Sequence, residues 1–117
     1  MERAAQNDEE KANAFAGRAR AYVCEGNLDT AISDFTEAIR LNPKYANAYA
    51  GRARAYEAKG EHAKAIADLT EAIRLDPAFA LAYYGRAIVY QNKGETAKAR
   101  EDFARARKLG YPPSPHP

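Results

Sequence analysis

Gly51-Arg52-Ala53 is the centre of the pattern that decides the fold, because the same triplet stands 34 residues earlier and 34 residues later, as Gly17-Arg18-Ala19 and Gly85-Arg86-Ala87. Other residues keep this register, among them Tyr22, Tyr56 and Tyr90, and Gly26, Gly60 and Gly94. A fixed period of roughly 20–50 residues is typical of proteins that stack one structural unit repeatedly. We therefore divide the chain into repeats at 12–45, 46–79 and 80–113, with a polar segment, 1–11, before them and a tail, 114–117, after them.

Each repeat is predicted to form two helices joined by a turn. Residues 46–59 are rich in alanine, arginine and glutamate, which favour helices, and Gly60 suits the left-handed conformation that often ends one. Residues 61–75 resume helical spacing, and Pro77 stops the second helix. No segment alternates with a period of two, so we expect an all-α fold without strands. Segment 1–11 should extend the first helix, whereas the tail 114–117 is predicted to be disordered.

The three units resemble the tetratricopeptide repeat (TPR) at many fixed offsets. Numbered within each repeat, they have an aromatic residue at 4 (Phe15, Tyr49 and Tyr83), alanine at 8 (Ala19, Ala53 and Ala87), tyrosine at 11 (Tyr22, Tyr56 and Tyr90), alanine at 20 and 27, and a large apolar residue at 24 (Phe35, Leu69 and Phe103). The proline at 32 is present as Pro43 and Pro77 but is Tyr111 in the third repeat. The resemblance implies helix-turn-helix hairpins stacked into a right-handed superhelix whose first helices line a concave groove. It also implies a non-catalytic scaffold that binds other proteins.

The composition is low in large apolar residues, but it fits a fold of closely packed helices. Leu, Ile, Val and Phe together number only 17, whereas alanine alone numbers 27. So few large apolar side chains are typical of disorder only when the net charge is high, and here the net charge is +2. Alanine lets helices approach closely, and aromatic side chains fill the remaining space. No apolar stretch reaches the roughly 18 residues of a membrane span, and the polar start is not a secretory signal, so we expect a cytoplasmic or other soluble intracellular protein.

The arginine at position 7 of each repeat is predicted to form a structural ion pair. A helical wheel places Arg18, Arg52 and Arg86 on the same buried face as positions 4, 8 and 11. A charge held away from water requires an opposite charge beside it. Position 23 of the repeat, which lies in the second helix, is an aspartate in all three units. We therefore expect the arginines to pair with Asp34, Asp68 and Asp102, either within a hairpin or between neighbouring hairpins.

The opposite face of the first helices is predicted to line the groove. Two arginines there can hold carboxylates through paired donors, asparagines can bond an extended backbone, and the third repeat supplies apolar side chains. The candidates are Asn13, Ala16, Arg20 and Val23 in the first repeat, Asn47, Ala50, Arg54 and Glu57 in the second, and Leu81, Tyr84, Ile88 and Gln91 in the third. This pattern favours a peptide whose acidic part meets the arginines and whose apolar part meets Tyr84 and Ile88. A solvated face without a ligand is the alternative.

Some TPR proteins that bind chaperone C-termini carry a lysine, asparagine and arginine clamp for the terminal carboxylate. At the matching positions this chain has Ala16, Arg20, Gly51, Leu81 and Gly85. Only Arg20 among them is polar, and it replaces an asparagine. Binding of that type is therefore not favoured.

The last helix is predicted to cap the array by itself. Positions 21 and 28 are isoleucine in the first two repeats but Arg100 and Arg107 in the third, and Arg105 replaces the glutamate at 26. A terminal repeat needs a polar outer surface. These substitutions would supply it, and ordinary drift in a truncated array is the alternative.

Residues suited to catalysis or metal binding do not cluster in the sequence. His62 and His116 have no partner at ligand spacing. No histidine shares a helical face with Cys24, which we expect to be buried or unreactive. The sequence thus predicts neither an enzyme nor a cofactor or metal site. Nucleic-acid binding is not favoured either, because 16 acidic residues balance 18 basic ones.

The sequence favours an interaction module whose partner is a protein or peptide, with the arginines selecting an acidic one. The alternative is a homo-oligomer that stacks end to end. Segment 1–11 carries four acidic residues against two basic ones, whereas the last helix is basic. Opposite charges at the two ends would favour such head-to-tail association.

Overall fold

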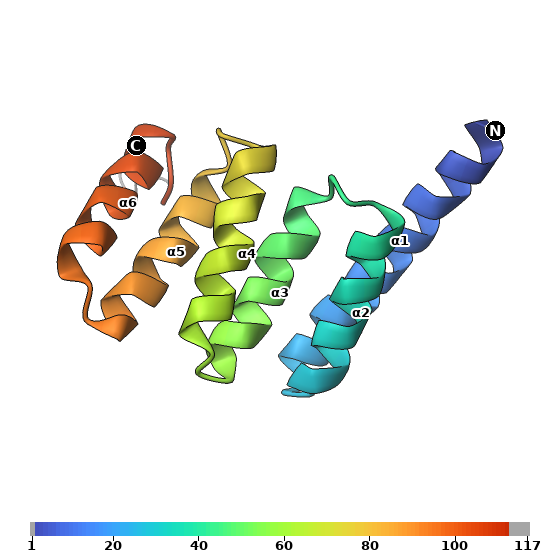
Figure 1. The fold of residues 1–117 in the computed structure, drawn as a ribbon, viewed down its shortest axis with the longest axis horizontal. Coiled ribbons are helices and arrows are strands. Elements are labelled where there is room, and N and C mark those ends of the chain that lie inside the picture. Colours follow the sequence, from blue (N-terminus) through green and yellow to red (C-terminus); the bar gives the residue numbers. More distant parts are fainter. Residues whose placement is uncertain (1, 113–117) are drawn as a thin grey trace.

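The computed structural model describes residues 2–112, with the side chains of residues 6–112. Over this range the chain forms helices and no strand: α1 (Glu2–Cys24), α2 (Leu28–Leu41), α3 (Ala46–Ala58), α4 (His62–Leu75), α5 (Ala80–Lys93) and α6 (Thr96–Lys108) (Figure 1). The prediction of an all-α fold is confirmed. Because α1 begins at Glu2, residues 2–11 continue the first helix of repeat 1. The disorder predicted for 114–117 lies outside the described residues.

A glycine in the left-handed conformation forms the turn within each hairpin, as the middle repeat illustrates. Gly60 has a φ of +79°, which side-chain-bearing residues rarely adopt. Its N–H donates to the Glu57 carbonyl, and the N–H of Glu61 donates to the Tyr56 carbonyl, both at 2.9 Å. These bonds satisfy carbonyls that would otherwise have no partner at the end of α3. The turn therefore reverses the chain without leaving polar groups unsatisfied.

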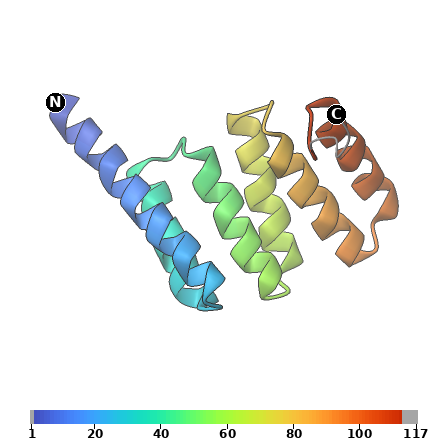
Figure 2. The same ribbon diagram turned by 180° about the vertical axis from the view of Figure 1, so that it is seen from behind.

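The three hairpins stand side by side in a row that measures 45 × 29 × 27 Å (Figures 1 and 2). Each helix packs on the next along the chain: α1 on α2, α2 on α3, and so on to α6. The first helices also contact one another, α1 with α3 and α3 with α5, whereas among the described residues α2, α4 and α6 do not. The row therefore closes on the side of the first helices, which makes that side concave.

Alanine dominates the buried core, as the composition indicates. Ala12, Ala19, Ala31, Ala38 and Ala48 are fully buried around Phe35, which is the largest fully buried side chain among the described residues. A second cluster gathers alanines of α3, α4 and α5 around Leu69. Because alanines bring the helix backbones close, a few large side chains suffice to fill each junction. At the far end, Arg100 and Arg107 are exposed on α6. The capping role of that helix stays a prediction.

Candidate functional site

A cavity of about 610 Å³ lies along the first helices on the concave side. Nine of the twelve predicted groove residues line it, namely Arg20, Val23, Asn47, Ala50, Arg54, Glu57, Leu81, Tyr84 and Ile88. The cavity does not reach Asn13 or Gln91, whose side chains are exposed. The structure thus gathers side chains from α1, α3 and α5 that are far apart in the sequence around one hollow.

The placement of Ala16 in the groove is wrong. Ala16 is fully buried in the cluster that contains Phe35 and Ala48. That cluster joins residues of α1, α2 and α3. A helical wheel describes the faces of one helix alone, so it could not show that a neighbouring hairpin closes over this position.

Glu57 lines the cavity, but its carboxylate is already engaged. The Glu57 Oε1 atom lies 2.7 Å from His62 Nδ1, at the start of α4. The Nδ2 group of Asn92, in α5, donates to Glu57 Oε2 at 2.7 Å. Glu57 therefore links α3 to both α4 and α5 and leaves the arginines as the charged groups free to meet a ligand.

Among the side chains of residues 6–112, Arg20 and Arg54 lack an acidic partner, unlike the five arginines that form ion pairs, Arg18, Arg40, Arg52, Arg74 and Arg86. Both side chains are exposed, and neither takes part in an ion pair among residues 6–112. By contrast, Arg40 and Arg74 each hold a glutamate three residues away on their own helix. Each hydrogen bond raises the pKa of its arginine and lowers the pKa of Glu37 or Glu71. The two groove guanidiniums can thus offer all their donors to a carboxylate.

The C-terminal end of the cavity is aromatic, and sequence reasoning missed one of its residues. Tyr111 follows α6 and lines the cavity, with its ring edge-to-face on Tyr84 at a centroid distance of 5.0 Å. Phe103 of α6 packs on the same tyrosine at 5.4 Å. The missed signal was the departure from proline at position 32, where Pro43 and Pro77 stand in the other repeats. An aromatic residue there adds a wall to the cavity.

Cys24 also lies at the cavity, so of the two expectations for its thiol, burial is wrong, and low reactivity stays a prediction. It is the last residue of α1, it is exposed, and it lines the cavity near Arg20. A helix end beside a glycine turn offers no second layer of side chains to cover it.

The position-7 arginines and position-23 aspartates lie within hydrogen-bonding distance in all three hairpins. Each arginine donates through Nε and Nη2 to both oxygens of one aspartate at 2.7–2.9 Å, always within its own hairpin: Arg18 with Asp34, Arg52 with Asp68, and Arg86 with Asp102. This paired geometry is the strong form of the interaction. The hydrogen bond to Asp68 raises the pKa of Arg52 above its ordinary value, although partial burial opposes the rise.

The expected burial is wrong for the first of these arginines. The Arg18 side chain is 58% exposed, whereas those of Arg52 and Arg86 are 18% exposed. The difference arises because α2 covers α3 and α4 covers α5, while nothing among the described residues covers that side of α1. The same motif is therefore solvated in the first hairpin and half-buried in the others.

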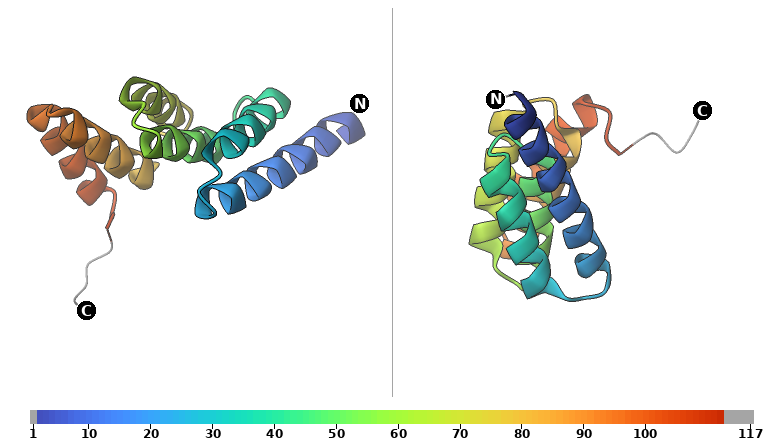
Figure 3. Two further views of the ribbon diagram at one scale, coloured as in Figure 1. Left: turned by 90° about the horizontal axis from the view of Figure 1, so that it is seen from below. Right: turned by 90° about the vertical axis from the view of Figure 1, so that its right-hand side faces the viewer.

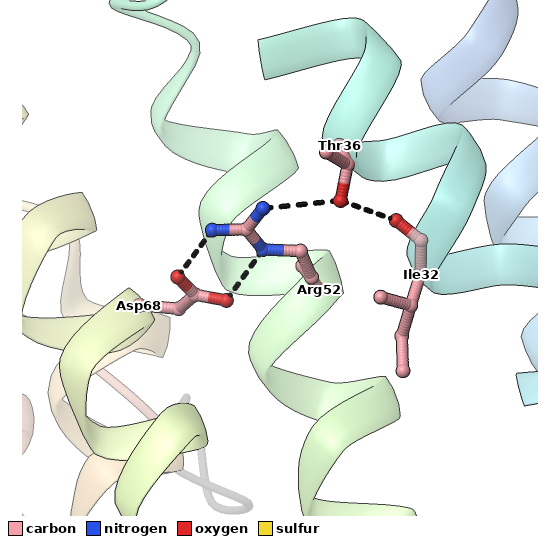
Figure 4. Close-up of polar contacts among 4 residues, drawn as sticks. All are labelled: Ile32, Thr36, Arg52 and Asp68. Carbon is pink, nitrogen blue, oxygen red and sulfur yellow. Dashed lines mark hydrogen bonds and ion pairs between the residues drawn. The ribbon is translucent and has the colours of Figure 1, made fainter. Parts of the chain in front are cut away.

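Arg52 and Arg86 make a further bond across the junction between hairpins. The Nη1 group of Arg52 donates to Thr36 Oγ1 at 3.1 Å, and that of Arg86 donates to Thr70 Oγ1 at 3.2 Å. Thr36 in turn donates its hydroxyl to the Ile32 carbonyl at 2.7 Å, so its oxygen is oriented to accept (Figure 4). Each arginine thus joins its own hairpin to the preceding one.

The described part of the chain has neither a cluster of metal-binding side chains nor a helix suited to a membrane. Residues 2–112 contain no group of three or more histidine, cysteine, aspartate or glutamate side chains placed to hold a metal ion. No helix in the same range is both long enough and apolar enough to cross a membrane.

The comparisons with known proteins agree with this architecture. Two family models described as tetratricopeptide repeat match the chain, one over residues 16–78 and the other over residues 69–101. No curated protein matches it significantly.

Solved TPR domains share the fold over nearly the whole chain. The second TPR of Spaghetti (RPAP3), solved with the HSP90 peptide SRMEEVD, is 29% identical with a TM-score of 0.87, and the match covers 92% of this chain and 98% of that one. The TPR2B domain of yeast Sti1, in a pHsp70 complex, is 31% identical with a TM-score of 0.84, covering 86% and 80%. The first TPR of Spaghetti, at 24% identity and a TM-score of 0.86 over 91% and 83%, is alike in fold. By its repeats, its helical hairpins and its match to the family models, the chain belongs to the tetratricopeptide repeat family.

Proposed function

We propose that the protein is a non-catalytic scaffold that binds an extended acidic peptide in its concave groove, with an apolar residue of that peptide at the aromatic end. The observation that carries the proposal is the cavity of about 610 Å³, which has two arginines at one end and Leu81, Tyr84 and Ile88 at the other. A preformed hollow with a few polar groups at fixed places is the usual form of a binding site.

The arginine end selects acidic residues. Arg20 and Arg54 stand one repeat apart on α1 and α3 and carry no ion pair among residues 6–112. A guanidinium holds a carboxylate through two parallel bonds, which gives direction as well as affinity. Because both groups are exposed, salt should weaken this part of the binding.

The aromatic end selects an apolar side chain. Tyr84 is held from two sides by Phe103 and Tyr111, so its ring is placed before a ligand arrives. Leu81 beside it is 50% exposed, and it is the most exposed of the large aliphatic residues described. Covering this surface supplies a hydrophobic contribution that does not depend on salt.

The peptide bound to a similar structure supports an acidic ligand, whereas this chain's own residues do not form the chaperone-tail clamp. The peptide bound to the second TPR of Spaghetti, SRMEEVD, contains three acidic residues. Of the positions that matched the chaperone-tail clamp in sequence, Ala16 is fully buried here and cannot touch a ligand. We therefore assign selection to Arg20 and Arg54 in place of that clamp.

Fluorescence anisotropy with labelled peptides tests the proposal. The probes are SRMEEVD and a set of heptapeptides with two or three acidic residues followed by Leu, Phe or Tyr, each paired with an uncharged version in which Gln and Asn replace Glu and Asp. The Arg20→Ala/Arg54→Ala double variant should lose about tenfold or more in affinity, since two charge-assisted contacts disappear. Raising the salt concentration should weaken wild type more than the double variant.

The matched control is Arg100→Ala/Arg107→Ala, which removes two exposed arginines from α6, away from the cavity. It should change affinity less than about twofold. Equal binding by wild type and the groove double variant would contradict the proposal. So would equal binding of acidic and uncharged peptides, or the failure of every acidic probe to bind.

A further inference from the structure

The outer face of α1, formed by Lys11, Ala14, Phe15, Arg18 and Ala21, is the second surface of interest, and we call it the N-terminal face. The right-hand view of Figure 3 looks onto this end of the row, with α1 in front. A shallow cavity of about 240 Å³ opens there between Lys11, Ala14, Phe15 and Arg18. This surface is separate from the concave groove.

The same positions are covered in the other two repeats. Ala14 and Ala21 are exposed on α1, but their equivalents on α3, Ala48 and Ala55, are fully buried beneath α2. On α5 the equivalents are Ala82 and Val89, which are buried beneath α4. The N-terminal face thus has the same residue positions as the faces of α3 and α5 on which α2 and α4 pack.

The helices that cover those faces share one side-chain pattern. α2 presents Ile32, Thr36 and Ile39, and α4 presents Ile66, Thr70 and Ile73, so each has isoleucine, threonine and isoleucine at i, i+4 and i+7. Residues at this spacing lie on one side of a helix. Ile39 packs in the cluster of Ala48, and Ile66 and Ile73 pack in the cluster of Ala82. The threonines accept the Nη1 bonds of Arg52 and Arg86.

We propose that the N-terminal face binds an amphipathic helix of a partner protein that carries the pattern Ile-x₃-Thr-x₂-Ile. The threonine accepts the Nη1 group of Arg18, whose Nε and Nη2 groups hold Asp34. The two isoleucines cover Ala14, Phe15 and Ala21. The partner helix would pack on α1 in the same register in which α2 packs on α3 and α4 packs on α5.

A second copy of this chain is not favoured as the occupant, because the side chains that would meet in this register oppose the stacking that the net charges of the two ends favour. The equivalent positions of α6 are Arg100, Ala104 and Arg107, which offer two positive charges and no hydroxyl. Stacked in the same register, they would approach Lys11 and Arg18 of the next molecule. Like charges at such close range are destabilising.

NMR titration of the isotopically labelled full chain tests the inference, and the chain itself supplies matched peptides. One peptide has the sequence of residues 61–76, with Ile66, Thr70 and Ile73, and the other has the sequence of residues 95–110, with Arg100, Ala104 and Arg107. The first should shift the amide signals of Ala14, Phe15, Arg18 and Ala21 in a saturable way, and the second should not at the same concentrations. Short helices form poorly in water, so binding is expected only at high peptide concentration, and Thr70→Val in the first peptide should weaken it further.

The Ala14→Glu variant shows whether the contact is on this face. Because Ala14 is exposed, the substitution leaves the fold intact, yet it should weaken the response by about tenfold or more, as a charge is placed where Ala48 is buried in the next repeat. Ala97→Glu, at an exposed site of α6, is the control and should bind like wild type. The Arg20→Ala/Arg54→Ala variant should also bind like wild type, which separates this face from the groove. An equal response to both peptides, no loss with Ala14→Glu, or shifts confined to the concave side would overturn the inference.

Discussion

α1 and α3 carry the same Gly-Arg-Ala triplet, but only α3 has a helix packed on that side within the described residues. Arg52 bonds both to Asp68 and to Thr36 of the preceding hairpin, whereas Arg18 bonds to Asp34 and stays 58% exposed. The difference teaches that a neighbouring repeat, more than the local sequence, decides how deeply a residue is buried. The stability of such arrays is accordingly a sum over junctions between neighbours.

The largest difference between the two arginines is expected in the free energy of unfolding when the aspartate partner is removed. Asp68→Ala leaves Arg52 half-buried without its counter-charge, and we expect a loss of about 3 kcal/mol in the free energy of unfolding. Asp34→Ala leaves Arg18 in contact with water, so the loss should be clearly smaller. Urea unfolding followed by circular dichroism measures both. Equal losses would mean that the covering helix does not change the strength of the pair.

The glycines of the triplets give the next largest contrast. A Cβ atom added at Gly51 would lie within 2.5 Å of Phe35 Cε1, whereas one added at Gly17 would meet nothing within 4 Å. Gly51→Ala should therefore cost about 1–2 kcal/mol through overpacking, while Gly17→Ala should stabilise the protein by about 0.5–1 kcal/mol because alanine favours the helix. Thermal unfolding gives the sign of each change.

The second junction provides a control for the steric explanation. At Gly85 an added Cβ would lie 3.6 Å from Leu69, which is ordinary contact, so Gly85→Ala should not destabilise. Replacing Phe35 by leucine should then reduce the penalty of Gly51→Ala. If the penalty is the same with phenylalanine or leucine at position 35, overpacking is not its cause.

The sequence predicts those parts of the fold that the repeat period determines. The helices, the turn at Gly60 and the match of position 7 with position 23 follow from residues that recur at fixed offsets. In such a register, one aspartate at a constant offset is a strong signal for its arginine. The side chains of the groove follow in the same way, since Arg20, Arg54 and Tyr84 share one face of their helices.

Features that depend on a neighbouring hairpin could not be predicted from a helical wheel. Ala16 is buried in a cluster that α1 shares with α2 and α3, and Arg18 is exposed because no described helix covers it. Glu57 of α3 forms hydrogen bonds with His62 of α4 and Asn92 of α5, and these contacts depend on the relative positions of three helices. Tyr111 reaches the groove only because the chain turns back after α6.

The smallest contrast concerns the single hydrogen bond that joins the first two hairpins. Thr36→Val removes the acceptor of the Arg52 Nη1 group while keeping the side chain's shape, and it should cost about 1 kcal/mol or less because the bond is near solvent. A double-mutant cycle of Thr36→Val with Arg52→Lys should give a coupling energy of about 0.5–1 kcal/mol, since a lysine that bonds Asp68 cannot also reach the hydroxyl. The same cycle with Arg18→Lys should give a coupling near zero, because Arg18 lies on the other side of its own hairpin from Thr36. Any effect of valine on helix propensity cancels within each cycle. If the coupling energy with Arg18 were as large as the coupling energy with Arg52, the hydrogen bond from Arg52 to Thr36 would not be what joins the two hairpins.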